Sequence, residues 1–364
     1  MREIPATWMR GGTSKCWVFE DDVLRSASVA GVDATLLRLF GSPDARQVDG
    51  IGGGTSTTSK AVILSPSSSS DADVDYTFAQ VGIDEAKVDW GSNCGNCSAV
   101  VGPYAVRRGW VPVEDGTTTV TVRNTNTGQL IVQQVPTPGR VLQESGTAWI
   151  PGVPFPGVPV RMGFVDPAGR TTGQLHPTGK AADELVTAEG TVRVTLIDAG
   201  APVVILDARQ MGLTGAESPV AIDGDHALLT RLDNIRRAAA VAMGLAVTPE
   251  TAERAIPKLA LVGPARPGDE AAFEVRMLSM GRVHPALAIT GSVALTLAAR
   301  DLATVLGPLV PQPVGEELTM RTPAGTLTTW TGDHGGLPVV GAVRTSRRLA
   351  ESSLLLPDDL PHAG

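Results

Sequence analysis

The sequence predicts an α+β fold of two similar domains, each a curved sheet wrapped around a central buried helix. Two segments, 98–106 and 286–299, are apolar on nearly every face, and a helix without a polar face must be surrounded by protein. One such segment lies in each half of the chain, which favours two similar domains. Glycine and proline, 41 and 27 of the 364 residues, separate many short runs rich in β-branched side chains, as is typical of strands joined by turns.

Periodicity and turn residues predict the elements of both domains. The expected strands are 117–123, 130–135, 191–197, 202–206 and 273–278. The expected helices are 34–40, 98–108, 226–243 and 286–299. The length suggests about two domains, which we place at 1–180 and 181–364, with the return of the last strand to the first domain left open. Residues 166–189 are expected to connect them.

The composition argues against several classes of protein. The chain is 42% apolar and carries a formal net charge of −8 without a block rich in Lys or Arg, which disfavours nucleic acid because its binding depends on neutralising phosphates. No run approaches the roughly 20 apolar residues of a membrane span, and residues 1–10 lack the pattern of a signal peptide. We therefore expect a cytoplasmic protein. Three cysteines, an odd number, do not indicate a disulfide framework and fit a reducing compartment in which a thiol can react.

The first candidate site is a glycine-rich polar turn, MRGGTSK, at residues 9–15 between two apparent strands. Adjacent glycines such as Gly12 let backbone N–H groups converge on an anion. The hydroxyls of Thr13 and Ser14, with the guanidinium of Arg10 or the amine of Lys15, could complete a carboxylate site. A tight hairpin turn with solvated charges is the alternative.

The second candidate is the loop GIGGGTSTTSK at 50–60, which brings Lys60 to the start of an apolar strand. Neither G-x-G-x-x-G nor the phosphate-loop signature is met, so we reject a nucleotide site. A lysine at such a strand end is partly desolvated, which favours the neutral amine and makes it available as a base. The alternative is a lysine that reaches from the strand end into solvent. Ser59, the residue before it, is assigned to substrate binding.

The third and most informative stretch is GSNCGNCS at 91–98, directly before the first buried helix. Cys94 is expected where the first N–H groups of that helix point, and their partial positive charge favours a thiolate that can act as a general base. Cys97 lies one turn further on and is expected to face the core. A C-x-x-C pair also suggests redox or zinc chemistry. Because the remaining Cys and His residues lack ligand spacing, we expect no metal site.

In the second half, MGRVHP at 280–285 precedes the other buried helix, which contains Thr290-Gly291-Ser292. His284 could donate a hydrogen bond to a carboxylate or shuttle a proton. It could equally be a histidine whose hydrogen bonds are satisfied at the entry to the helix. The chain has neither G-x-S-x-G nor H-E-x-x-H, which weakens a hydrolase interpretation.

These motifs resemble those of the PrpF family of aconitate and methylaconitate isomerases, which also includes 4-oxalomesaconate tautomerase and methylitaconate isomerase. The matching segments are MRGGTSK, the loop ending TSK, NCGN, MGRVHPALAITGS and GAVRTSRRL. The resemblance covers nearly the whole chain. It implies the diaminopimelate epimerase-like fold, an active site between the two domains, and catalysis without a cofactor.

By motif, the resemblance implies that Lys60 and Cys94 are the acid/base pair. The residues assigned to the substrate are Arg10, Gly12, Thr13, Ser14, Ser59, Asn93, Gly95, Asn96, His284, Thr290, Gly291 and Ser292. Epimerases of this fold use one cysteine from each domain, and Thr290 stands at the second position here, which disfavours a two-thiol racemase. Cys16 stands where glycine is expected and Cys97 where an apolar residue is expected, and both departures bear on substrate identity.

The resulting prediction is a cofactor-independent isomerase or tautomerase that catalyses a 1,3-proton shift in a small unsaturated di- or tricarboxylic acid. Aconitate, methylaconitate and 4-oxalomesaconate are examples. Two alternatives stay open, a racemase or epimerase of the same fold and a protein that binds carboxylates without turning them over. The expected partner is the small carboxylate, with no nucleic acid or membrane, and a homodimer is left open.

Overall fold

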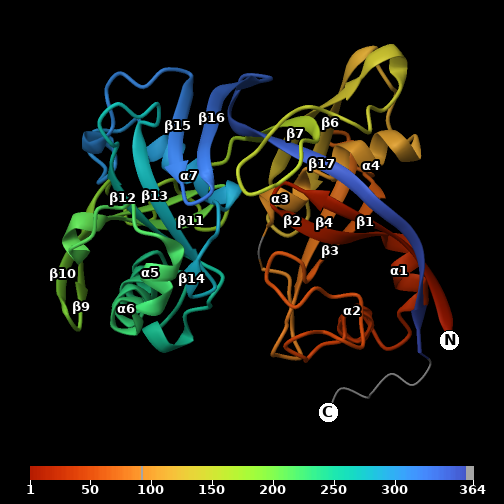
Figure 1. The fold of residues 1–364 in the computed structure, drawn as a ribbon, viewed down its shortest axis with the longest axis horizontal. Coiled ribbons are helices and arrows are strands. Elements are labelled where there is room, and N and C mark those ends of the chain that lie inside the picture. Colours follow the sequence, from red (N-terminus) through yellow and green to blue (C-terminus); the bar gives the residue numbers. More distant parts are fainter. Residues whose placement is uncertain (92, 358–364) are drawn as a thin grey trace. The chain divides into compact units, whose positions relative to one another are not determined.

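A computed structural model describes residues 1–91 and 93–357 of the chain. It divides into two compact units, Met1–Met162 with Arg344–Gly364 (unit 1) and Gly163–Val343 (unit 2). The chain leaves unit 1 within strand β8 (Val158–Val165) and returns to it within β17 (Leu337–Leu356) (Figure 1). The division expected from the sequence, at residue 180, assigns 163–180 to the first domain instead.

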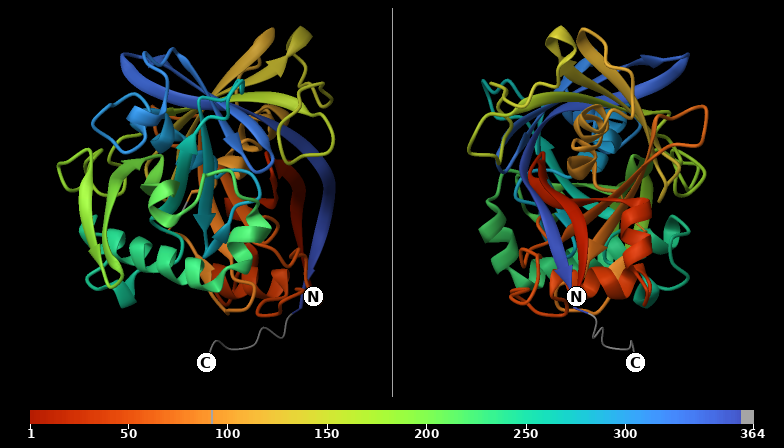
Figure 2. Two further views of the ribbon diagram at one scale, coloured as in Figure 1. Left: turned by 60° about the vertical axis from the view of Figure 1, so that its left-hand side comes forward. Right: turned by 90° about the vertical axis from the view of Figure 1, so that its right-hand side faces the viewer.

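Unit 1 is built from hydrogen-bonded strand pairs. Its hairpin of β1 (Arg2–Gly11) and β2 (Ser14–Glu20) is followed by β3 (Lys60–Pro66), parallel to β2, and β4 (Val74–Val81), antiparallel to β3. β4 also pairs with the short β5 (Val88–Asp89) and, in parallel, with β6 (Gly116–Asn124), which is antiparallel to β7 (Leu130–Thr137). The end of β17 lies antiparallel beside β1 (Figure 2), so the last strand closes the unit that the first one opens.

Unit 1 has two helices after β2 and one central helix. α1 (Asp21–Ala27) and α2 (Val32–Phe40) follow β2 and pack Leu24, Leu36 and Phe40 into an apolar core. The central helix consists of α3 (Gly95–Ser98) and α4 (Val101–Arg108), and Val101 to Val106 are all buried. The expectation of a first helix surrounded by protein is therefore confirmed. A 3-10 turn, η1 (Pro138–Arg140), follows β7.

The central helix of unit 1 is interrupted where the sequence predicts a continuous one. Ala99 N–H bonds to Asn96 O at 3.2 Å and Val100 N–H to Cys97 O at 3.1 Å, so the chain tightens between α3 and α4. Pro103 supplies a reason, because proline has no N–H to donate to the carbonyl four residues earlier. Restarting the helix at Val101 places the proline within the first turn, where that N–H is not needed.

Unit 2 repeats the strand order of unit 1. β10 (Gly190–Ala199) forms a hairpin with β11 (Ala201–Asp207), which is parallel to β12 (Lys258–Pro264), and β12 is antiparallel to β13 (Phe273–Ser279). β13 pairs with the short β14 (Arg282–Val283) and, in parallel, with β15 (Glu317–Thr322), which is antiparallel to β16 (Gly325–His334). β9 (Asp183–Thr187) is added beside β10.

The helices of unit 2 stand at the same points of the repeat. α5 (Pro219–Gly224) and α6 (His226–Ala242) follow β11, and α6 packs against β9 and β12. The central helix α7 (Ile289–Ala298) is buried along its length except at Leu297, which confirms the second expected core helix. Short 3-10 turns are η2 (Ala208–Met211), η3 (Pro249–Thr251) and η4 (Gly307–Leu309). Within the described residues, no helix combines the length and apolar character needed to cross a membrane.

Candidate active site

The turn between β1 and β2 is held against the start of the central helix of unit 1. Gly11 pairs with Ser14, which leaves a two-residue loop, and Gly12 takes a φ of +52°, which favours glycine at the first loop position. A Cβ at Gly12 would collide with the Asn96 side chain. Thr13 N–H donates to Asn96 Oδ1 at 3.4 Å. The motifs MRGGTSK and NCGN, far apart in the sequence, therefore lie in direct contact.

Arg10 is turned toward the chain itself. Its Nη1 donates to Gly12 O at 3.1 Å, to Thr345 O at 2.8 Å and to Thr345 Oγ1 at 2.8 Å. Burial, and then the positive charge of Arg347, lower the pKa of Arg10. The guanidinium thus ties the turn to β17, and its expected contact with a substrate carboxylate stays a prediction.

Lys60 opens β3 and is 8% exposed. Its Nζ donates to Gln80 Oε1 at 2.5 Å and lies 4.8 Å from the centre of the Phe78 ring. Gln80 is itself fixed, because its Nε2 donates to Ser59 O at 2.8 Å. The Lys60 side chain is therefore desolvated and does not reach into solvent. A single neutral amide, that of Gln80, orients its amine.

Ser59 is fully buried and its hydroxyl is already engaged. Ser59 Oγ donates to Val81 O at 2.9 Å and accepts from Gln47 Nε2 at 2.7 Å. The residue therefore anchors the glycine-rich loop to β4 directly before Lys60. Its expected contact with the substrate stays a prediction.

Cys94 is the N-cap of α3, as its position before the buried helix predicts. Its Sγ accepts from Cys97 N–H at 3.4 Å. Its carbonyl accepts from Ser98 N–H at 2.8 Å and from the Tyr76 hydroxyl at 3.3 Å. The thiol is thereby fixed at the first turn of the helix, in which Asn96 contacts the turn that carries Gly12.

The three cysteines of the chain form one cluster of free thiols. The Cys97 side chain lies close enough to that of Cys94 to act on the pKa of Cys94, and the Cys16 side chain acts in the same way on the pKa of Cys97. The bond to Cys97 and then burial raise the pKa of Cys94 well above its ordinary value, while the charge of Lys60 acts in the opposite direction. The expectation that the helix start favours a thiolate is therefore wrong in direction, because neighbouring thiols and burial outweigh the N–H groups.

Several polar groups around this thiol have no partner within the described residues. They are the hydroxyl Oγ1 of Thr13 and both amide atoms, Nδ2 and Oδ1, of Asn93, all buried. Ser14 is 3% exposed, and no hydrogen bond of its hydroxyl is recorded among the described residues. Buried polar groups are normally satisfied, so a cluster of unsatisfied ones beside a thiol and a lysine is what a polar ligand would complete. Gly95, which is buried, adds no side chain to this space.

Two of the residues assigned in unit 2, Ser292 and His284, have hydrogen-bond partners within unit 2. Ser292 Oγ donates to Ile289 O at 2.8 Å, and a Cβ at Gly291 would meet the Met277 side chain. His284 Nδ1 accepts from Ala286 N–H at 3.0 Å, so in the neutral ring the proton is on Nε2. Thr290 lies buried in the first turn of α7. Their expected contacts with the substrate stay predictions.

Gln80 and Tyr76 are two site residues that the motifs do not indicate. Gln80 lies directly opposite Lys60 in the register of β3 and β4, and this register is the only signal that could have identified it. Tyr76 lies in β4 like Gln80, and its hydroxyl donates to the Cys94 carbonyl. Both are polar residues in a strand that otherwise alternates toward the core, YTFAQV. Among the described residues, no group of three or more His, Cys, Asp or Glu side chains could hold a metal ion.

Comparison with known proteins agrees with the motifs. The family described as PrpF protein matches residues 1–357. The 4-oxalomesaconate tautomerase of Pseudomonas putida is 40% identical over 359 residues, which cover 98% of this chain and 97% of that protein. The 2-methyl-aconitate isomerase of Shewanella oneidensis is 37% identical, with 98% and 97% of the two chains covered.

A solved structure extends the similarity to the architecture. Methylitaconate-delta-isomerase matches with a TM-score of 0.83 at 34% identity, and the match covers 100% of this chain and 99% of that one. The α+β, diaminopimelate epimerase-like fold expected from the sequence is thereby confirmed. The three relatives are named for different acids, so similarity alone does not single out one of them.

Proposed function

The chain belongs to the PrpF family, and from this premise we propose that it is an isomerase that moves a proton, and with it a C=C bond, within a small unsaturated di- or tricarboxylic acid. The relatives, named for oxalomesaconate, methylaconitate and methylitaconate, support this substrate class. Cytoplasmic localisation and a homodimer stay predictions.

One observation carries the proposal. The thiol of Cys94 and the amine of Lys60 interact electrostatically, since the charge of Lys60 acts to lower the pKa of Cys94. Beside them lie the unpartnered amide of Asn93 and hydroxyl of Thr13. Two proton-carrying groups of different kinds beside unsatisfied hydrogen-bonding groups are what a proton shift in a carboxylic acid needs.

Lys60 and Cys94 act together in this proposal, and one of the two must lack a proton before the pair can take one from the substrate. In one form of the pair Lys60 is a neutral amine and Cys94 is a thiol. In the other form Lys60 is an ammonium and Cys94 is a thiolate. Because Cys97 and burial raise the pKa of Cys94, the thiol keeps its proton, and the proposal takes the first form. Lys60 is then the base that takes the C–H proton, and Cys94 is the acid that gives a proton to the far carbon.

The bonds balance in this scheme. Lys60 removes a proton from a carbon next to a carboxylate or keto group, and the electron pair delocalises over the conjugated system. Cys94 protonates the other end of the allylic unit, so the double bond moves and the composition of the acid is unchanged. The pair is reset when a proton passes from the ammonium to the thiolate. Thr13, Asn93 and Asn96 can stabilise the developing oxyanion, a contribution that is often the largest in such reactions.

Thr290 bears on the racemase alternative. A racemase of this type needs a second acid/base group of thiol acidity, and an alcohol such as the Thr290 hydroxyl is a much weaker acid than a thiol. Stereochemical inversion at a saturated carbon is therefore disfavoured, and migration of the double bond is the proposed outcome.

The test is incubation of the purified chain with cis-aconitate, 2-methylaconitate, 3-methylitaconate and 4-oxalomesaconate in deuterated buffer. We expect the alkene absorbance to change for at least one acid, and NMR to show deuterium on the carbon that receives the proton. Thermal stabilisation by these acids without any turnover would instead indicate a binding protein. Inversion at a saturated carbon without alkene migration would indicate a racemase.

A further inference from the structure

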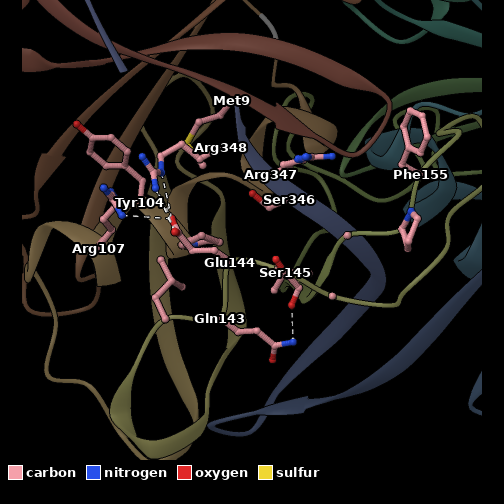
Figure 3. A pocket seen from close by; sticks show the side chains of 16 residues that line it. Met9, Tyr104, Arg107, Gln143, Glu144, Ser145, Phe155, Ser346, Arg347 and Arg348 are labelled. Atoms are coloured by element: carbon pink, nitrogen blue, oxygen red, sulfur yellow. Dashed lines mark hydrogen bonds and ion pairs between the residues drawn. The ribbon is translucent and has the colours of Figure 1, made fainter. Parts of the chain in front are cut away.

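A pocket of unit 1 lies against α4, outside the residues assigned to catalysis (Figure 3). Its volume is about 490 Å³, within the range of small-molecule sites. Among the described residues, none of those assigned to the acid/base pair or to the substrate lines it. The walls come from Met9 of β1, from Tyr104 and Arg107 of α4, from loop residues before β8, and from 346–348 of β17.

Two of the three arginines in this pocket are neutralised. Glu144 accepts from Arg348 at 2.8 Å and from Arg107 at 3.2 Å. Glu351 pairs with the same two arginines, at 3.0 Å from Arg107 and 3.2 Å from Arg348. The charges of these two arginines and two glutamates cancel, and Figure 3 shows Arg107, Arg348 and Glu144 on one side of the pocket.

Arg347 is different, because no carboxylate among the described residues pairs with it. In Figure 3 its guanidinium extends to the opposite side from Glu144, toward Phe155. Its charge is felt by Arg10, whose pKa is lowered by burial and then by Arg347. An uncompensated positive charge thus stands at the pocket, in a chain whose net charge is −8.

Ser346 supplies an independent indication of a ligand. The residue is 3% exposed and its Oγ is buried without a hydrogen-bond partner among the described residues. It lines the pocket next to Arg347 on β17. A buried hydroxyl left unpaired is costly, and a guanidinium beside a hydroxyl donor is a combination suited to a carboxylate.

The remaining lining is apolar. Met9, Leu142, Tyr104, Phe155 and Pro156 all face the pocket, and Phe155 is 65% exposed although it is large and apolar. A small inorganic anion would leave this surface uncovered. We propose that this pocket binds a small organic monocarboxylate, whose carboxylate meets Arg347 and Ser346 and whose apolar body covers Met9 and Phe155. This is a second site, separate from the catalytic residues of unit 1.

The experiment is isothermal titration calorimetry of the full chain at low salt with three probes. They are 3-phenylpropionate, its uncharged amide, and inorganic phosphate. We expect 3-phenylpropionate to bind, and both the amide and phosphate to bind at least about 10-fold more weakly, the scale of a charge-assisted hydrogen bond and of a buried apolar group. No binding of 3-phenylpropionate, or phosphate bound as tightly, would overturn the proposal.

Single substitutions test whether 3-phenylpropionate binds in this pocket. Arg347→Gln should weaken 3-phenylpropionate at least about 10-fold and Ser346→Ala about 2- to 10-fold, the usual scales for charged and neutral hydrogen bonds. Arg25→Gln, which removes the same charge from an exposed arginine of α1 outside the pocket, should bind like the wild type. Lys60→Met and Cys94→Ser should also bind like the wild type. Loss of binding in those two, or full binding by Arg347→Gln, would overturn the assignment.

Discussion

The two units share one strand order and differ in what they place at the start of the central helix. In both, a lysine opens the third strand of the repeat, Lys60 in β3 and Lys258 in β12. In both, a hairpin glycine packs on that helix, since a Cβ at Gly11 would meet Asn96 O and one at Gly200 would meet Thr290 O. The common scaffold is therefore preserved in detail.

The chemistry is not preserved. Unit 1 has the thiol of Cys94 and the unpartnered groups of Asn93 and Thr13 at this position. Unit 2 has Thr290, and Ser292 bonds to its own helix. Unpaired polar groups cost stability and are kept where a ligand uses them. The difference supports assigning the proposed proton transfer to unit 1, because the start of α7 carries a threonine in place of the thiol.

The most direct test of this difference between the two units is to replace Lys60 and Lys258 separately. Lys60→Met should lower kcat by about 10²- to 10⁴-fold, because a positioned base is lost. Lys258→Met should leave kcat within about 10-fold, below the usual range for such a base. Steady-state kinetics on the acid that is turned over measures both. Equal losses would mean that the two units share the chemistry.

A second prediction concerns the group that orients Lys60. Gln80→Glu replaces the neutral amide that accepts from Lys60 Nζ by a carboxylate, and a negative charge at this close range stabilises the ammonium form. The acid limb of the kcat/KM profile should move to higher pH, with Gln80→Met as the uncharged control. An unshifted limb in Gln80→Glu would show that Lys60 is not the base.

A third prediction separates the two thiols of NCGNC. The bond to the Cys97 thiol is the largest cause that raises the pKa of Cys94, so Cys97→Ala should let that pKa fall. Cys94 would then lose its proton at lower pH, and the alkaline limb of kcat should move down while the acid limb stays. An alkaline limb at its wild-type position in Cys97→Ala would rule out Cys94 as the proton donor.

The smallest expected effect is on stability. The pKa values of Cys94 and Cys97 are raised in the folded chain above the ordinary 9.0, so the folded state keeps protons that the unfolded state releases. Their contribution is complete below pH 9 and is lost as the pH rises above it. Urea unfolding at pH 8 and pH 10 should show a smaller decrease for Cys97→Ala than for the wild type. The same decrease in both would contradict the raised pKa values of these buried thiols.

How far the sequence predicts the structure depends on the range of the contacts involved. The two central helices follow from local pattern, because segments with no polar face must be enclosed. The motifs that contain Gly12 and Asn96 were both recognised in the sequence, but the contact between the two residues was not predicted. The hydrogen bond of Arg10 to Thr345 could not be predicted from local pattern, because the two residues are 335 positions apart in the sequence.

The thiol cluster is the clearest case in which local reasoning gives the wrong sign. A cysteine at a helix start suggests a thiolate, and Cys94 does stand at that start. The opposing influence comes from Cys97 and, through it, Cys16 on β2. That contact depends on how β2 packs against the helix. Gln80 was missed for a similar reason, since only strand register brings it to Lys60.

The central claim, that Cys94 is the reacting thiol of unit 1, is tested most directly by comparing Cys94→Ser with Cys97→Ser at saturating substrate. The account predicts that Cys94→Ser melts close to the wild type but loses at least about 10²-fold in kcat, the usual scale for a positioned acid/base group. Cys97→Ser should lose stability and keep kcat within that limit. A Cys94→Ser enzyme with near wild-type kcat, beside an inactive but folded Cys97→Ser enzyme, would contradict the claim.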